Sequence, residues 1–204
     1  MICMQERSNL AFLVVNFFTF FRILVFPFVL VLILNGGVVN ILVAFLLFVF
    51  GAFTDAFDGM LARKYKVSSK FGFILDPIAD KFLVLGTLLA MSLVDYLMIP
   101  LWCFFVILFR DILVSVLKPI SDKLGFPIPT TFFAKLKTTT QFVGIIFIFV
   151  YMFLVNIYKV DKIGFEGLLF VPYYIVLVLV VITVISGFEY VFLFLKGLLN
   201  VRGK

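Results

Sequence analysis

Long apolar stretches separated by short connectors run through most of this sequence of 204 residues. Roughly 20 consecutive apolar residues let a helix cross the hydrocarbon core of a bilayer, and only helices and closed barrels satisfy every backbone polar group there. The strands of a barrel would be roughly 10 residues long and would alternate apolar with polar side chains, which these stretches do not. The sequence therefore predicts an all-α, polytopic membrane protein.

Six of these stretches are long enough to be transmembrane helices. They are 12–34, 38–62, 71–94, 96–118, 132–157 and 168–196. Composition supports this interpretation, because 65% of the residues are hydrophobic and only 14% are charged, which is more apolar surface than one soluble core of this length buries. The connectors leave no room for a soluble domain, so we expect a single membrane domain over 1–204.

Lysine and arginine indicate the side of the membrane on which each connector lies. If the N-terminus, 63–70, 118–137 and the C-terminus share one side, 15 of the 17 basic residues lie there or within the spans, and only Lys159 and Lys162 lie opposite. The positive-inside rule makes that side cytoplasmic, so we expect a protein of the cell (inner) membrane with both termini in the cytoplasm. The net charge of +6 then indicates contact with anionic membrane lipids and no nucleic-acid partner, because the basic residues border the spans.

Two of the predicted helices carry paired aspartates, with Asp55 and Asp58 in the second and Asp76 and Asp80 in the third. An ionisable side chain inside a span costs about 2.5–3.5 kcal/mol on the insertion scale, so intramembrane acids indicate functional sites. The members of each pair lie three or four residues apart and therefore project from one face of a helix. A tight turn at 64–70 would set the two pairs facing each other in a cytoplasm-facing cavity.

Four carboxylates crowded together in a low dielectric repel one another unless they are protonated or neutralised by a cation. Hard divalent cations prefer carboxylate oxygens, so the four aspartates predict a site for two metal ions, Mg²⁺ or Mn²⁺. Pro77 follows Asp76 and cannot donate to the Phe73 carbonyl. The third helix therefore either kinks at this point or begins there, with Asp76 in its first turn.

Small residues and an arginine accompany the acids. Gly59 directly follows Asp58, and Gly72 lies four residues ahead of Asp76, which leaves backbone uncovered for close approach of a ligand or a helix. Arg63 offers a planar guanidinium fork suited to phosphate. The chain contains no histidine, so carboxylates must transfer any protons.

The combined pattern resembles the signature of the CDP-alcohol phosphatidyltransferase family at every specified position. It reads Asp55-x-x-Asp58-Gly59-x-x-Ala62-Arg63 and, after eight residues, Gly72-x-x-x-Asp76-x-x-x-Asp80. The resemblance implies a homodimeric membrane enzyme in which an alcohol displaces CMP from a CDP-linked lipid. It also implies that Asp55, Asp58 and Asp76 hold the metals, and that Asp80 is both a metal ligand and the general base. By the same resemblance, the CDP moiety would be bound by Gly59, Arg63 and Gly72.

The likeness continues along the chain and is closest to the phosphatidylglycerophosphate synthase branch of the family. Asn16, Thr19 and Arg22 match the N-x-x-T-x-x-R start of that branch, which implies that Asn16 and Thr19 also contact the CDP-lipid. The stretches FRDILVSVLK, AKLKTTTQ and SGFEY match it as well. This resemblance implies CDP-diacylglycerol and sn-glycerol 3-phosphate as the substrates.

Four basic residues are expected to bind the phosphate of the acceptor alcohol, namely Arg110, Lys118, Lys135 and Lys137. On a helix Lys137 shares a face with Gln141, whereas Lys135 and Lys137 project about 160° apart. Lys137 is therefore the stronger candidate of these two lysines.

Three alternatives stay open. Arg110-Asp111 stands where phosphatidylglycerophosphate synthases commonly have Arg-Glu, and this pair is closer to the cardiolipin synthases of the same family. An inositol-phosphate-using member is the second alternative. A divalent cation transporter is the third, since such proteins also hold acids inside the membrane. Basic residues beside the acids, such as Arg63 and Lys64, favour a phosphate ligand over a path for cations.

Overall fold

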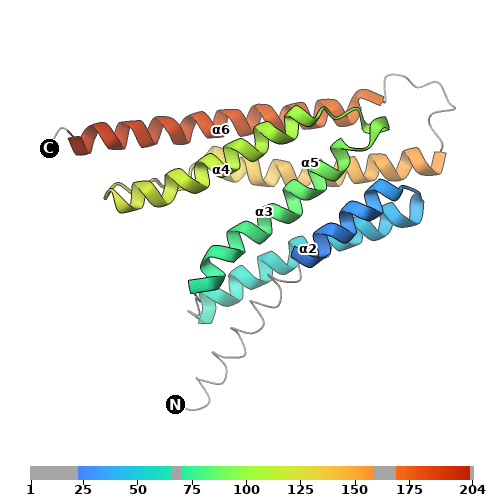
Figure 1. Cartoon of the computed structure of the whole chain (residues 1–204), viewed down its shortest axis with the longest axis horizontal. Helices are drawn as coiled ribbons and strands as arrows, with labels where there is room; N and C mark the ends of the chain where they lie inside the picture. The colour runs from blue at the N-terminus through green and yellow to red at the C-terminus, as the bar shows by residue number, and fades with distance from the viewer. Residues whose placement is uncertain (1–22, 66–69, 159–168, 203–204) are drawn as a thin grey trace, which may run out of the picture. The chain divides into compact units, whose positions relative to one another are not determined.

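The computed structural model of the chain describes residues 23–65, 70–158 and 169–202, of which 55–65, 70–80 and 202 are described by their backbone alone. Its helices are Ile23–Asn35, α2 (Val38–Tyr65), α3 (Lys70–Ser92), α4 (Leu101–Lys123), α5 (Phe132–Tyr158) and α6 (Val171–Arg202), with a 3₁₀ turn, η1, at Asp95–Leu97 (Figure 1). These described ranges contain no strand, which confirms the all-α prediction.

Each of the six predicted spans overlaps one of these helices. Two described stretches, Phe132–Tyr158 and Val171–Val201, are long and apolar enough to cross a bilayer. Shorter apolar helical stretches are Ile23–Asn35, Val38–Thr54 and Lys81–Ser92. Many large apolar side chains lie on the outside of the helices, as with Phe109 and Phe188, which are 68% and 71% exposed. An apolar exterior of this extent suits lipid rather than water, and together with the apolar helices it indicates a membrane protein.

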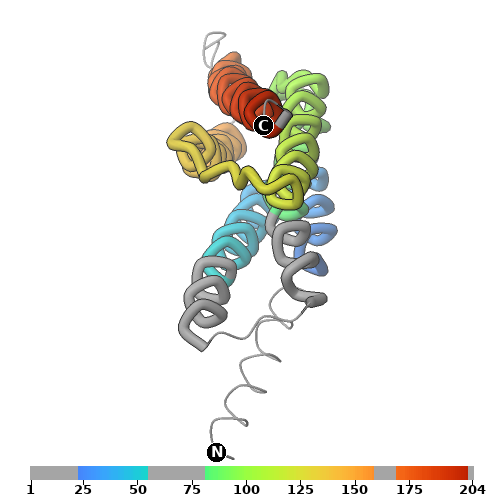
Figure 2. Tube along the Cα trace, turned by 90° about the vertical axis from the view of Figure 1, so that its left-hand side faces the viewer, coloured from blue at the N-terminus to red at the C-terminus, as the bar shows by residue number. Residues whose placement is uncertain are grey.

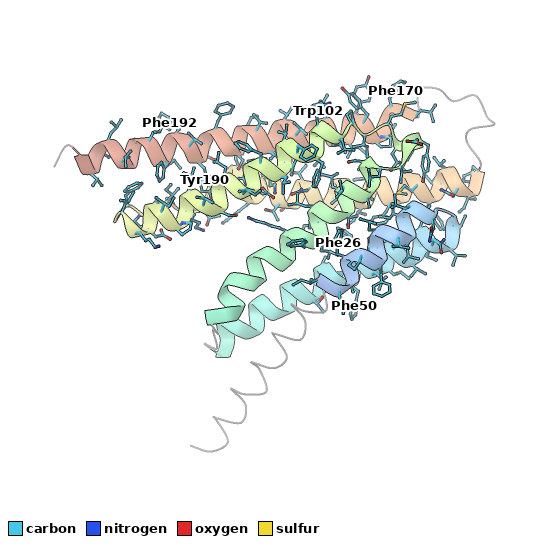
Figure 3. The ribbon with its side chains drawn as sticks, in the orientation of Figure 1. Phe26, Phe50, Trp102, Phe170, Tyr190 and Phe192 are labelled. Carbon is cyan, nitrogen blue, oxygen red and sulfur yellow. The ribbon has the colours of Figure 1, made fainter. Side chains whose placement is uncertain are left out.

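The chain forms two units, and the first holds the described residues up to Val94 together with Met152–Tyr158. In this unit α2 packs against α3. The Phe26 ring lies against the backbone of Gly86 in α3, in the space that a Cβ atom would occupy, and its centroid is 6.4 Å from that of Phe82 (Figure 3). The absence of a side chain at position 86 therefore lets the Ile23–Asn35 helix approach α3 closely.

The second unit holds Asp95–Tyr151 and residues 169–202. Within it α4 and α6 lie side by side, as Figure 2 shows. A Cβ atom at Gly144 of α5 would lie 3.0 Å from Leu179 Cδ1 of α6, so α5 also approaches α6 closely at this glycine. A small residue thus allows the close α5–α6 contact in this unit.

Helix α4 ends in a Schellman motif. Gly125 has a φ of +82°, which is a left-handed conformation that glycine adopts without steric cost. Its N–H donates to the Asp122 carbonyl, and the Phe126 N–H donates to the Ser121 carbonyl. Because these bonds satisfy the last carbonyls of the helix, α4 stops at Lys123 and the chain turns toward α5.

Candidate active site

The seven positions predicted to bind metal and CDP lie on two neighbouring helices. Helix α2 carries the first four, and α3 carries the last three; they are Asp55, Asp58, Gly59, Arg63, Gly72, Asp76 and Asp80. The helical backbone confirms that each aspartate pair shares one helix face. The side chains of 55–80 lie outside the described residues, so the meeting of the four carboxylates stays a prediction, and Asn16 and Thr19 also lie outside the described residues.

Helix α3 continues through Pro77. It begins at Lys70, six residues ahead of Asp76, so the alternative in which Asp76 occupies the first turn is wrong. A proline inside a helix lacks the N–H that would bond the carbonyl four residues earlier, here that of Phe73. That carbonyl lies about one turn from Asp76 and loses its usual intrahelical partner.

A second group of polar residues lies inside the second unit, where α4, α5 and α6 each contribute charged or polar side chains. Its centre is the ion pair between Lys137 of α5 and Asp111 of α4. Lys137 Nζ donates to both carboxylate oxygens of Asp111, at 2.8 Å to Oδ1 and 2.7 Å to Oδ2. The side chains are 7% and 4% exposed, so both charges are removed from solvent and each depends on the other.

Arg110 joins this ion pair to α6. Its Nη1 donates to Asp111 Oδ1 at 3.2 Å, and its Nη2 donates to Ser186 Oγ. The guanidinium carbon also lies 5.6 Å from the ring centroid of Tyr190, within the range of a cation–π interaction. A Cβ atom at Gly187 would lie 3.0 Å from Arg110 Cγ, so this glycine makes room for the arginine stem.

The four basic residues predicted to bind the acceptor phosphate lie in two different environments. Arg110 and Lys137 meet at one buried carboxylate, although they lie on different helices. Lys118 and Lys135 are exposed on α4 and α5. Gln141 is 2% exposed and Lys137 is also buried, which confirms that these two residues share the inward face of α5 and that Lys135 does not.

Sequence reasoning missed several residues of this group. From the sequence, Asp111 has no predicted role as the partner of Lys137, and Ser186, Glu189 and Tyr190 belong only to a matching stretch. Ser186 and Glu189 are three residues apart and Ser186 and Tyr190 four apart, which places them on one face of α6. That spacing was the available signal, since a polar run inside an otherwise apolar helix indicates an inward face. We call Arg110, Asp111, Lys137, Gln141, Ser186, Glu189 and Tyr190 the inner polar cluster.

Comparison with known proteins places these residues in a family. Residues 12–185 match the CDP-alcohol phosphatidyltransferase family. A protein of Rickettsia bellii named CDP-diacylglycerol–glycerol-3-phosphate 3-phosphatidyltransferase is 34% identical over 176 residues, which cover 86% of this chain and 91% of the relative. A protein of Mycobacterium tuberculosis named "Probable phosphatidylglycerophosphate synthase" is 38% identical over 141 residues, or 68% of this chain and 64% of the relative.

A protein of Cereibacter sphaeroides with the same name as the rickettsial one is 41% identical over 110 residues, which cover 52% of this chain and 48% of the relative. The chain thus spans less than two thirds of the mycobacterial and Cereibacter proteins and nearly all of the rickettsial one. The family match includes the complete aspartate motif on α2 and α3 and the α4 and α5 residues of the inner polar cluster, and it ends at residue 185, just ahead of Ser186 on α6. The chain therefore belongs to the CDP-alcohol phosphatidyltransferase family.

Proposed function

We propose that this protein transfers a phosphatidyl group from CDP-diacylglycerol to sn-glycerol 3-phosphate, which gives phosphatidylglycerophosphate and CMP. Family membership supports the transfer chemistry, and the names of relatives at 34–41% identity support the acceptor. The observation in the structure that carries the choice of acceptor is the pair of cations, Arg110 and Lys137, held together at the buried carboxylate of Asp111. Two neighbouring cations suit a small acceptor that carries a phosphate group.

The four aspartates would hold the metal ions. Two carboxylate pairs, at i, i+3 and i, i+4 on helices that pack together, form an all-oxygen donor set, which fits two hard divalent cations, Mg²⁺ or Mn²⁺. Cations bound by Asp55, Asp58, Asp76 and Asp80 would neutralise the charge of the pyrophosphate group. Gly59, Arg63 and Gly72, with Asn16 and Thr19, would bind the CDP-lipid.

Asp80 would act as the general base. It would take the proton from the primary hydroxyl of the acceptor as that oxygen attacks the phosphorus of the phosphatidyl group. The bond from that phosphorus to the CMP oxygen then breaks, and CMP leaves. The chain has no histidine that could do this work, and a carboxylate needs only to lie within hydrogen-bond reach of the hydroxyl.

The acceptor phosphate would be bound by Arg110 and Lys137, with Lys118 and Lys135 attracting it from the exposed ends of their helices. Asp111 neutralises part of the charge of the two cations and fixes where they lie. This arrangement keeps two cations in place before the ligand arrives, so less ordering is needed when a phosphate binds.

The proposed enzyme is one catalytic domain with six transmembrane helices. Exposed basic residues near the helix ends, such as Lys118, Lys123 and Lys135, support a cytoplasmic position for the acceptor site. The active-site cavity and both termini would then face the cytoplasm, the protein would lie in the inner membrane, and it would work as a homodimer.

A comparison of acceptors tests this function. Purified protein in detergent micelles with CDP-diacylglycerol and Mg²⁺ should release CMP fastest with sn-glycerol 3-phosphate, when inositol 1-phosphate and phosphatidylglycerol are offered in parallel. Faster release with phosphatidylglycerol would instead indicate a cardiolipin synthase, the activity favoured by the Arg110-Asp111 pair. Transport of a divalent cation into proteoliposomes without any CMP release would contradict phosphatidyl transfer altogether.

A further inference from the structure

Three buried polar atoms of the inner polar cluster find no hydrogen-bond partner among the residues that the structure describes. They are Arg110 Nε, Gln141 Nε2 and Glu189 Oε2. Buried polar groups in folded proteins are nearly always paired, and a group left unpaired is costly. Three such atoms from one small region therefore indicate a ligand that completes their hydrogen bonding.

Helix spacing and the contacts of Arg110 place the residues that carry these three atoms around one ion pair. Gln141 lies one turn after Lys137 on the inward face of α5, and Lys137 binds Asp111, the neighbour of Arg110. On α6, Glu189 lies three residues after Ser186 and next to Tyr190 in the sequence, and both Ser186 and Tyr190 contact Arg110. Arg110 thus connects the α5 side of the cluster to its α6 side.

The chemistry of the three atoms restricts the ligand. Arg110 Nε and Gln141 Nε2 are donors and need acceptor oxygens, whereas Glu189 Oε2 is an acceptor and needs a donor such as a hydroxyl group. Because the carboxylates of Asp111 and Glu189 lie in the same cluster as Arg110 and Lys137, the cations alone do not define the ligand, and its hydrogen-bonding groups must match as well. A ligand that carries both a phosphate and a free hydroxyl satisfies all three atoms.

We infer that Gln141 and Glu189 determine specificity by binding the C2 hydroxyl of the acceptor. This inference rests on the proposed function, in which the primary hydroxyl reacts and the phosphate is bound by cations, so that C2 carries the one remaining hydroxyl. Glu189 accepts the hydrogen bond of this hydroxyl, and Gln141 donates one to its oxygen. An acceptor without the C2 hydroxyl leaves Gln141 Nε2 and Glu189 Oε2 without this hydrogen-bond partner.

The test compares sn-glycerol 3-phosphate with 3-hydroxypropyl phosphate, which keeps the primary hydroxyl and the phosphate and lacks only the C2 hydroxyl. The readout is the ratio of kcat/KM for the two acceptors, measured as CMP release. The wild-type enzyme should prefer sn-glycerol 3-phosphate by roughly 10- to 100-fold, the effect of one hydrogen bond to a charged group. A ratio within one preparation does not depend on the fraction of the protein that is folded.

Glu189→Met and Gln141→Met remove the polar groups at similar volume and should each lower the ratio at least fivefold, chiefly through loss of activity with sn-glycerol 3-phosphate. Glu189→Gln keeps an acceptor oxygen and should retain part of the preference.

Thr140→Val, next to Gln141 on α5, is the control and should keep the wild-type ratio, because the Thr140 hydroxyl donates to the Leu136 carbonyl of its own helix. For a variant that is inactive with both acceptors, the rise in melting temperature caused by each acceptor gives the same comparison.

Two results would contradict the inference and are distinguishable. If the wild-type enzyme uses sn-glycerol 3-phosphate but both methionine variants keep the full preference, recognition of the C2 hydroxyl by these residues is wrong and the proposed function stands. If the wild-type enzyme does not use sn-glycerol 3-phosphate at all, the proposed function fails and this inference fails with it.

Discussion

Replacing Asp111 by asparagine should strongly destabilise the protein. The carboxylate accepts two hydrogen bonds from Lys137, at 2.7 and 2.8 Å, and one from Arg110 at 3.2 Å, and it is 4% exposed. Removing one partner of a buried ion pair typically costs about 3–5 kcal/mol, because the other charge stays buried without compensation. For a chain of this length that loss lowers the melting temperature by about 6–20 °C.

The assay measures thermal unfolding in a mild detergent. Its readout is the fraction of protein that stays monodisperse after heating to each temperature. Asp122→Asn is the matched control, since Asp122 is an exposed aspartate on the same helix. The double variant Asp111→Asn/Lys137→Met removes both charges, and it should recover about half or more of the lost stability. An Asp111→Asn protein that melts within about 2 °C of Asp122→Asn, a difference of less than ~1 kcal/mol, would refute the structural importance of this ion pair.

Three further predictions concern the other unit and the chemistry. Gly86→Ala should lower the free energy of unfolding by about 1–3 kcal/mol in the same assay, because the new methyl group meets the Phe26 ring; an unchanged melting temperature would contradict that close approach. Excess EDTA should abolish CMP release and added Mg²⁺ or Mn²⁺ should restore it, whereas full activity in EDTA would exclude the carboxylate metal site. Asp80→Asn should keep affinity for the CDP-lipid and lose turnover, whereas Asp58→Asn should lose both; equal turnover of Asp80→Asn and wild type would remove Asp80 as the base.

The sequence predicted the helices well and their ends less well, for a physical reason. The predicted span 132–157 agrees with α5 (Phe132–Tyr158), but the span predicted to end at 196 continues in α6 to Arg202. Hydropathy reports where lipid-compatible residues stop, and a helix can continue into the aqueous phase beyond that point. The start of α4 shifted from 96 to Leu101 because a 3₁₀ turn at Asp95–Leu97 and the extended Pro100 precede the helix.

The candidate site was predictable where it depends on local spacing. The shared face of Lys137 and Gln141 follows from the helical period, and both side chains are buried. The Lys137–Asp111 pair joins residues 26 positions apart on two helices, so no local pattern could reveal it. For the same reason the sequence could not show that Lys137, which was expected to bind phosphate, is held by a carboxylate of the protein itself.

The most direct test of the central claim follows the acceptor into the product. Purified protein reconstituted with CDP-diacylglycerol, Mg²⁺ and radiolabelled sn-glycerol 3-phosphate should transfer the label into an organic-extractable lipid, with one CMP released for each label incorporated. Asp58→Asn protein, purified in the same way, should transfer none. Release of CMP while the label stays in the aqueous phase would show hydrolysis or another acceptor, and would contradict the proposed phosphatidyl transfer to glycerol phosphate.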